Sequence, residues 1–293
     1  MADKWEEMTV SDVEVTPEYE RQFERELTTA GSFVPVKGIR GLGWRGWQNL
    51  PAADLVKDLI DWHVGFMREH VDLPYYLFFH KMIEKGELTL DELRSYYSNY
   101  YSFVNNMFPW EGYVTAQLQE RIRVERNDPE GIREARDLFR AHFYEEAGHE
   151  ELLADYCKNA LGLDKVKDLY IPALKTEENY LKTNHDFFKI IYRDHHFTEA
   201  AVLMFAERDL PRPHRRVRKG LKAQYGFGNK DIIYFDVHSY IDIYHERYGQ
   251  YLIAKHATSK ELQENVSKLF KQIMETRLES EKRFYSTLKA SRR

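Results

Sequence analysis

The chain has 293 residues and a formal net charge of −5, with acidic and basic residues interspersed along its length. This balance gives no reason to expect nucleic acid or an anionic membrane as a partner. The single cysteine, Cys157, excludes an internal disulfide and any cysteine-based zinc or iron–sulfur site. Aromatic residues make up 14% of the chain, enough for a sizeable core, in which we expect Cys157 to be a small buried hydrophobe.

The N-terminal segment differs in composition from the rest of the chain. Residues 1–7 lack a basic region followed by an apolar run, and no apolar stretch is long enough to span a bilayer. We therefore expect a soluble, cytoplasmic protein. Residues 1–50 combine acidic, helix-like sequence with a Gly- and Trp-rich piece, which predicts an N-terminal extension to a single domain formed by residues 51–293.

Nearly everything after residue 50 has the periodicity of helices. Residues 53–70 show amphipathic spacing, and a short helix is expected over residues 74–85. Thr89 and Glu92 form a capping box that opens a long, Tyr-rich helix, with a break expected at Pro109.

The second half of the chain continues the helical pattern, with no strand-like alternation and no internal repeat. Gly148 lies inside one of the expected helices, where Gly is unfavourable unless the backbone bends or another helix comes close. The fold class predicted is all-α, a single-domain helical bundle. Its further helices are expected over residues 129–161, 176–195, 198–208, 236–256 and 259–288.

Three side chains that can bind a metal lie at helical spacing in the C-terminal part of the chain. His238, Asp242 and His245 are related as i, i+4 and i+7. On one helix they would fall within about 60° of one another and span about 10 Å of its axis. The spacing fits one wall of a metal site, and it fits equally two core histidines and a capped Asp.

A second pair of residues favours the metal site. Glu146 and His149 are i and i+3 in another predicted helical stretch. Helical bundles build carboxylate-bridged di-iron centres from such pairs. Carboxylate and imidazole donors without thiolates suit iron or manganese rather than structural zinc.

Taken together, these stretches resemble the heme-oxygenase-like di-iron oxidases, whose fold is shared with pyrroloquinoline-quinone synthase and thiaminase II. The resemblance covers about residues 55–290 and implies a heme-oxygenase-like helical bundle. It depends most on "FYEEAGHEELLADYCKNALGLD", "AVLMFAERDLPRP" and "YFDVHSYIDIYHERYG", and less on the early aromatic helices that begin at "PYYLFFHKM".

The resemblance also implies a set of ligands for two Fe²⁺ ions. Some relatives carry a carboxylate where His142 stands here, so we expect His142 to support the site or the core rather than to bind metal. Glu199 is the rival of Glu207 as third carboxylate, and Pro211 together with the distance to His238 favours Glu207. The ligands implied are Glu146, His149, Glu207, His238, Asp242 and His245, with His142 and Glu199 as candidates to contact and orient them.

Other polar residues near these motifs are expected to have no role in the site. Glu145, Glu150 and Glu151 are expected to face solvent, with one of them left as a residue that could orient a ligating histidine. The remaining histidines are expected at the surface or satisfied in the core; they are His63, His70, His80, His185, His195, His196, His214 and His256.

The function implied is a non-heme di-iron oxidoreductase that uses O2 as co-substrate and acts on a small organic substrate through a peroxo-diferric intermediate. We favour N-oxygenation of an amine in a biosynthetic pathway, because Glu111 and the Tyr-rich helix offer polar groups for an amine. Oxidative C–C cleavage or desaturation of a fatty acid or amino acid stays open. So do a metal-free cofactor-biosynthesis enzyme and a non-catalytic protein of this fold. No macromolecular partner is expected, with a homodimer left open.

Overall fold

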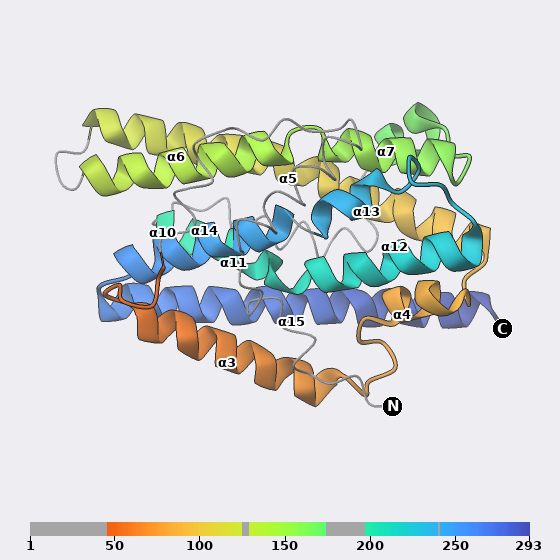
Figure 1. Ribbon diagram of the computed structural model, residues 1–293, viewed down its shortest axis with the longest axis horizontal. Helices are drawn as coiled ribbons and strands as arrows, with labels where there is room; N and C mark the ends of the chain where they lie inside the picture. Colours follow the sequence, from red (N-terminus) through yellow and green to blue (C-terminus); the bar gives the residue numbers. More distant parts are fainter. Residues whose placement is uncertain (1–45, 125–128, 174–196, 240) are drawn as a thin grey trace.

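The structure, a computed structural model, describes residues 46–124, 129–173, 197–239 and 241–293 (Figure 1). Throughout these ranges the regular structure is helical, which confirms the all-α fold class. Residues 1–45 and the helix expected over residues 176–195 lie outside the described residues. The division of the chain at residue 50 therefore stays a prediction.

The helices form three layers in Figure 1: α5, α6 and α7 above, α10 to α14 in the middle, and α15 with α3 and α4 below. The longest helices, α5 and α15, lie in the outer layers, and the middle layer is interrupted several times. The elements are α3 (Ala53–His70), α4 (Phe78–Lys85), α5 (Leu90–Val124), α6 (Pro129–Glu146), α7 (His149–Asn159), a π-helix (Lys165–Tyr170), α8 (Ile171–Ala173), α10 (Phe197–Ala200), α11 (Val202–Ala206), a 3-10 turn (Glu207–Asp209), α12 (Pro211–Tyr225), α13 (Ile233–His238), α14 (Ile241–His256) and α15 (Lys260–Ser291).

Several helix ends follow the local sequence signals. The capping box at the start of α5 is confirmed, since the Thr89 N–H donates to Glu92 Oε2 at 2.8 Å and the Glu92 N–H donates to Thr89 Oγ1 at 3.2 Å. Pro211 begins α12 rather than only ending the helix before it, which suits a residue without an N–H. The break expected at Pro109 is wrong, because α5 runs through it while packed against α6 and α7.

Two helices expected to be continuous are divided. The chain turns at Gly148, whose φ of 92° is left-handed, so α6 ends at Glu146 and α7 begins at His149. The expected helix over residues 236–256 is divided between α13 and α14. One interruption falls between Glu146 and His149 and the other between His238 and Asp242.

Side chains from all three layers form the core. Two clusters of buried side chains fill the bundle, and Phe103 and Leu152 pack against both of them. Helix α14 approaches α11 so closely that a Cβ on Gly249 would lie less than 3 Å from the backbone of Ala201 and Phe205. These two helices of the middle layer are thus held at short distance from each other.

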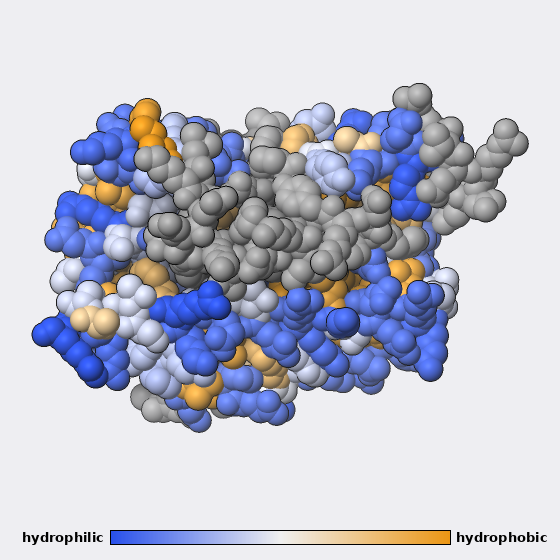
Figure 2. All heavy atoms as spheres, turned by 180° about the vertical axis from the view of Figure 1, so that it is seen from behind, coloured by the Kyte–Doolittle hydropathy of each residue, from blue (hydrophilic) through white to orange (hydrophobic). Residues whose placement is uncertain are grey.

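The outer surface is mainly hydrophilic, with apolar residues scattered among polar ones on the coloured part of the face in Figure 2. Among the described residues, no helix combines the length and the apolar character needed to cross a bilayer.

Candidate metal centre

The turn at Gly148 brings Glu146 and His149 into direct contact. Glu146 is the last residue of α6 and His149 the first of α7. The His149 Nδ1 lies 2.6 Å from Glu146 Oε2, and the His149 side chain is buried. The expected pair therefore exists, although a bend in the chain rather than one straight helix creates it.

The C-terminal motif also spans an interruption between helices. His238 is the last residue of α13, while Asp242 and His245 lie on the first turns of α14, and all three side chains are buried. His238 Nε2 lies 3.8 Å from Glu146 Oε2. The two motifs, separated by about ninety residues, thus meet at one carboxylate.

A first group of possible metal ligands comprises His142, Glu146, Glu207 and His245. Their donor atoms all lie within 4.8 Å of one another. His245 Nδ1 is 2.7 Å from Glu207 Oε2 and 3.1 Å from Glu146 Oε1. His142 Nε2 is 3.1 Å from Glu207 Oε1. Of the two rival carboxylates, Glu207 is in this group and Glu199 is in neither group.

A second group comprises Glu146, His149 and His238, again with donor atoms within 4.8 Å of one another. The His149 and His238 rings lie 4.5 Å apart. Glu146 belongs to both groups, with Oε1 facing His245 and Oε2 facing His149. A carboxylate with one oxygen turned to each of two imidazole clusters has the arrangement of a bridging ligand.

Asp242 is the carboxylate whose environment most needs a cation. It is 1% exposed, and neither of its oxygens has a hydrogen-bond partner among the described residues. The nearest imidazole nitrogens are His214 Nδ1 at 3.8 Å and His245 Nδ1 at 3.9 Å. Burial raises the pKa of Asp242 well above its usual range. Because a buried unpaired carboxylate is costly, a bound cation would stabilise it.

The charges around His245 also favour a cation. Burial would lower the pKa of His245, but Glu207 and the other carboxylates around the ring raise it well above the usual value. Burial would raise the pKa of Glu207, but His142 and His245 outweigh it and lower the pKa to about 2. The centre is therefore a buried set of anionic oxygens that holds positive charge.

Glu145 departs from the expectation that it faces solvent. It is completely buried, and its Oε2 lies 3.3 Å from His245 Nε2. A signal for this was present in the sequence, because Ala135, Leu138, His142 and Glu145 are spaced 3, 4 and 3 residues apart along α6 and are all buried. The same spacing turns His142 inward.

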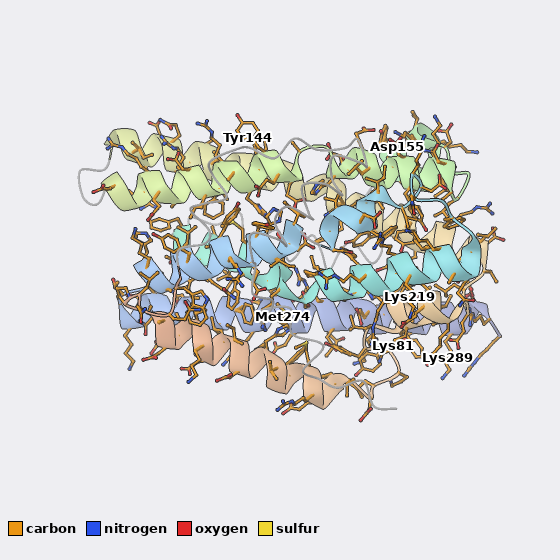
Figure 3. All side chains as sticks on the ribbon, in the orientation of Figure 1. Lys81, Tyr144, Asp155, Lys219, Met274 and Lys289 are labelled. Atoms are coloured by element: carbon orange, nitrogen blue, oxygen red, sulfur yellow. The ribbon has the colours of Figure 1, made fainter. Side chains whose placement is uncertain are left out.

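His214, which the sequence did not single out, connects the centre to a cavity. The cavity has a volume of about 130 Å³, and His214 lines it while its Nδ1 lies 3.8 Å from Asp242. Space of that size holds about four water molecules or one small organic molecule. Met274, labelled in Figure 3, lines the cavity from α15. Further aromatic lining residues are Phe66, Tyr76, Tyr96, Tyr97, Tyr100, Phe103 and Phe235.

The fold and the site together define a helical bundle with a buried carboxylate–imidazole centre, and comparison with known proteins agrees with this class. Residues 94–278 match a family described as iron-containing redox enzymes, and the chain belongs to that family. A TenA homolog from Pseudomonas syringae pv. tomato is similar in structure, with a TM-score of 0.61 and 13% identity over 87% of this chain and 99% of that chain. The heme-oxygenase-like fold expected from the sequence is thereby confirmed. No curated protein matches the sequence significantly.

Proposed function

We propose that the chain is a non-heme di-iron oxidoreductase that uses dioxygen to oxidise a small organic substrate. The observation that carries this proposal is the position of Glu146, whose two oxygens face two separate imidazole clusters. Each cluster has two imidazoles and at least one carboxylate, donors typical of non-heme iron sites. Membership of a family of iron-containing redox enzymes supports the choice of metal.

The proposed ligand set enlarges the one expected from the sequence. One iron would be held by His142, Glu207 and His245 and the other by His149 and His238, with Glu146 shared between them. Asp242 belongs to neither group, but we include it because its buried oxygens lack hydrogen-bond partners among the described residues and lie 3.9 Å from His245 and 3.8 Å from His214. His142 joins as a ligand because its Nε2 belongs to the first group, where we had expected only a supporting role.

Neighbouring groups orient two of the imidazoles for this role. The His238 Nδ1 lies 2.9 Å from the Tyr234 carbonyl oxygen, which fixes the proton on Nδ1 and leaves Nε2 facing Glu146. Glu145 contacts His245 Nε2, so Nδ1 of that ring faces Glu146 and Glu207. Such partners set the tautomer and the basicity of a ligating histidine.

Bound iron would supply the redox chemistry with dioxygen, while the chain holds the ligands in a buried site next to a cavity. The Tyr-rich helix lines that cavity through Tyr96, Tyr97 and Tyr100, which keeps N-oxygenation of an amine as our proposed reaction. The side chain of Glu111 lies outside the described residues. The same centre would also serve oxidative C–C cleavage or desaturation, which product analysis distinguishes.

A metal-free enzyme of the same fold is the second candidate, favoured by the structural similarity to the TenA homolog. Thiaminase-like chemistry needs a nucleophilic cysteine. Cys157 is completely buried, and burial raises the pKa of its thiol to about 12. A thiol in that state is a poor nucleophile, which favours the metal-dependent proposal.

Anaerobic titration of metal-free protein with ferrous ion tests the proposal. We expect saturation at about two irons per chain and a transient visible absorption when oxygen is added. His245→Ala should abolish that absorption while circular dichroism shows helicity nearly unchanged. Mass spectrometry of candidate amines incubated with the loaded protein and oxygen should detect added oxygen rather than lost carbon. A protein that takes up no iron would refute the proposal.

A further inference from the structure

The cavity beside the proposed metal centre contains a carboxylate that lacks a cationic partner. Glu281 lines the cavity from α15, and its Oε2 accepts a hydrogen bond from the Leu77 backbone N–H. Among the described residues no cationic side chain forms an ion pair with Glu281. Lys81, the nearby lysine, donates instead to the Val71 carbonyl oxygen at 3.0 Å. The carboxylate therefore lies in the cavity wall with a backbone amide as its hydrogen-bond donor, while Lys81 and Arg277 stabilise its charge through space without an ion pair.

Within the part of the chain that the structure describes, the other charged side chains that line the cavity form no ion pair with Glu281. Asp209 and Arg277 also line the cavity and pair with each other at 2.5 Å. The Arg277 guanidinium donates further to the Ala206 carbonyl oxygen, also at 2.5 Å. The wall itself carries two carboxylates and one guanidinium, and Lys81 acts on Glu281 from outside it. A ligand ammonium group at Glu281 would form the ion pair that no described side chain supplies.

The uncharged part of the wall fits an amine. His80 lines the cavity, and its buried Nδ1 has no hydrogen-bond partner. Burial, assisted by Arg216, lowers the pKa of His80 to about 4, so its neutral ring can accept a hydrogen bond from an ammonium group. Tyr96 stacks on Phe79 and lies nearly parallel to Tyr100, and the aromatic surface that the two tyrosines present to the cavity suits an apolar chain.

We propose that the cavity binds a primary ammonium group at Glu281 and directs the apolar remainder of the molecule past the tyrosines towards His214. Resting on the proposed function, this makes the substrate an amine whose ammonium group is held for recognition while another part of the molecule reacts. N-oxygenation then requires a second nitrogen in the part near His214, whereas oxidative C–C cleavage or desaturation requires none. Glu281 lies on α15 and the shared ligand Glu146 at the end of α6, in opposite outer layers (Figure 1). His214 of α12, in the middle layer, connects the cavity to Asp242.

Calorimetric titration of the full chain tests the inference without any turnover. The probes are hexylamine, 1-hexanol and hexanoate, which share a chain length and differ in charge, at pH 8.5. We expect hexylamine to bind at least tenfold more tightly than 1-hexanol, a difference of about 1.4 kcal/mol, and hexanoate to bind least. Equal affinities for the amine and the alcohol, or tighter binding of hexanoate, would overturn the inference.

Three variants locate the binding. Glu281→Gln keeps an oxygen acceptor for the Leu77 N–H but removes the charge, so it should abolish the preference for the amine. Glu279→Gln, a matched control on the exposed face of the same helix, should leave the preference intact. Leu278→Trp, which fills the cavity, should weaken amine and alcohol alike. An unchanged preference in Glu281→Gln, or an equal loss in Glu279→Gln, would contradict the assignment.

The two proposals fail separately, because the amine titration needs neither iron nor oxygen. Iron uptake without any amine preference would leave the di-iron proposal standing and remove the ammonium site. Amine preference without iron uptake would establish the ammonium site and remove its connection to an oxidase. Thermal unfolding of each variant reports whether the fold is intact, and the probe series on the unchanged protein tests the inference without any variant.

Discussion

Replacing Glu146 by Gln is the perturbation most informative about the centre. The substitution preserves the shape of the side chain and removes its charge together with one metal-binding oxygen. Glu146 lies 2.6 Å from His149, 3.1 Å from His245 and 3.8 Å from His238, so the change affects both clusters at once. If Glu146 bound only one ion, its replacement would leave the other cluster unaffected.

The expected magnitude follows from the shared position. Residues that only support a metal ligand already change affinity by about 10- to 100-fold when replaced. A ligand that contacts both ions should cost at least the upper end of that range for each, about 100-fold or about 2.7 kcal/mol per ion. At ferrous concentrations that saturate the unchanged protein, both iron positions of the Glu146→Gln variant should then be largely empty.

Anaerobic ferrous titration against a chromophoric competitor measures both affinities. Glu150→Gln is the matched control, because Glu150 lies on the first turn of α7 and belongs to neither ligand group. It should bind two irons with unchanged affinity. Two irons bound normally by Glu146→Gln would refute the ligand assignment. The loss of one iron only would refute the sharing of Glu146 and reassign it to a single ion.

Three further predictions concern packing, thiol reactivity and pH. Gly249→Ala should lower the free energy of unfolding by about 1–3 kcal/mol, since the added Cβ would lie less than 3 Å from backbone atoms of Ala201 and Phe205. Gly65→Ala on α3, where a Cβ meets nothing within 4 Å, should raise the free energy of unfolding by up to about 1 kcal/mol. Urea unfolding measures both variants, and midpoints that shift in the same direction for the two would contradict the prediction. Cys157 should react with iodoacetamide at pH 8 only after unfolding, because the thiol is buried and its pKa is raised to about 12; rapid labelling of the native protein would show otherwise. Burial raises the pKa of Glu281 to about 8, so the carboxylate that binds an ammonium group is scarce below that pH. Calorimetric affinity for hexylamine should therefore rise by up to about tenfold per pH unit between pH 6 and 8 and then level off, and an affinity independent of pH would count against the site.

The sequence alone determined the features that depend on near neighbours in the chain. Helical class follows from the spacing of apolar residues, and the capping box at Thr89 and Glu92 forms because both partners lie within one turn. The pairing of Glu146 with His149 was visible for the same reason. The family resemblance, since confirmed, added the fold and pointed to Glu207 as a further ligand.

Tertiary structure decided what depends on contacts between distant segments. The turn at Gly148 and the division between α13 and α14 decide that Glu146 faces both clusters, and no spacing rule for one straight helix contains that information. His142 enters the first group because Glu207, 65 residues away, lies beside it. Glu281 lines the cavity with a backbone hydrogen bond in place of an ion pair, because its donor is the N–H of Leu77, 204 residues away. Local periodicity determines which face of a helix is buried, whereas the protonation state and the neighbours of a buried group are determined only when the helices pack.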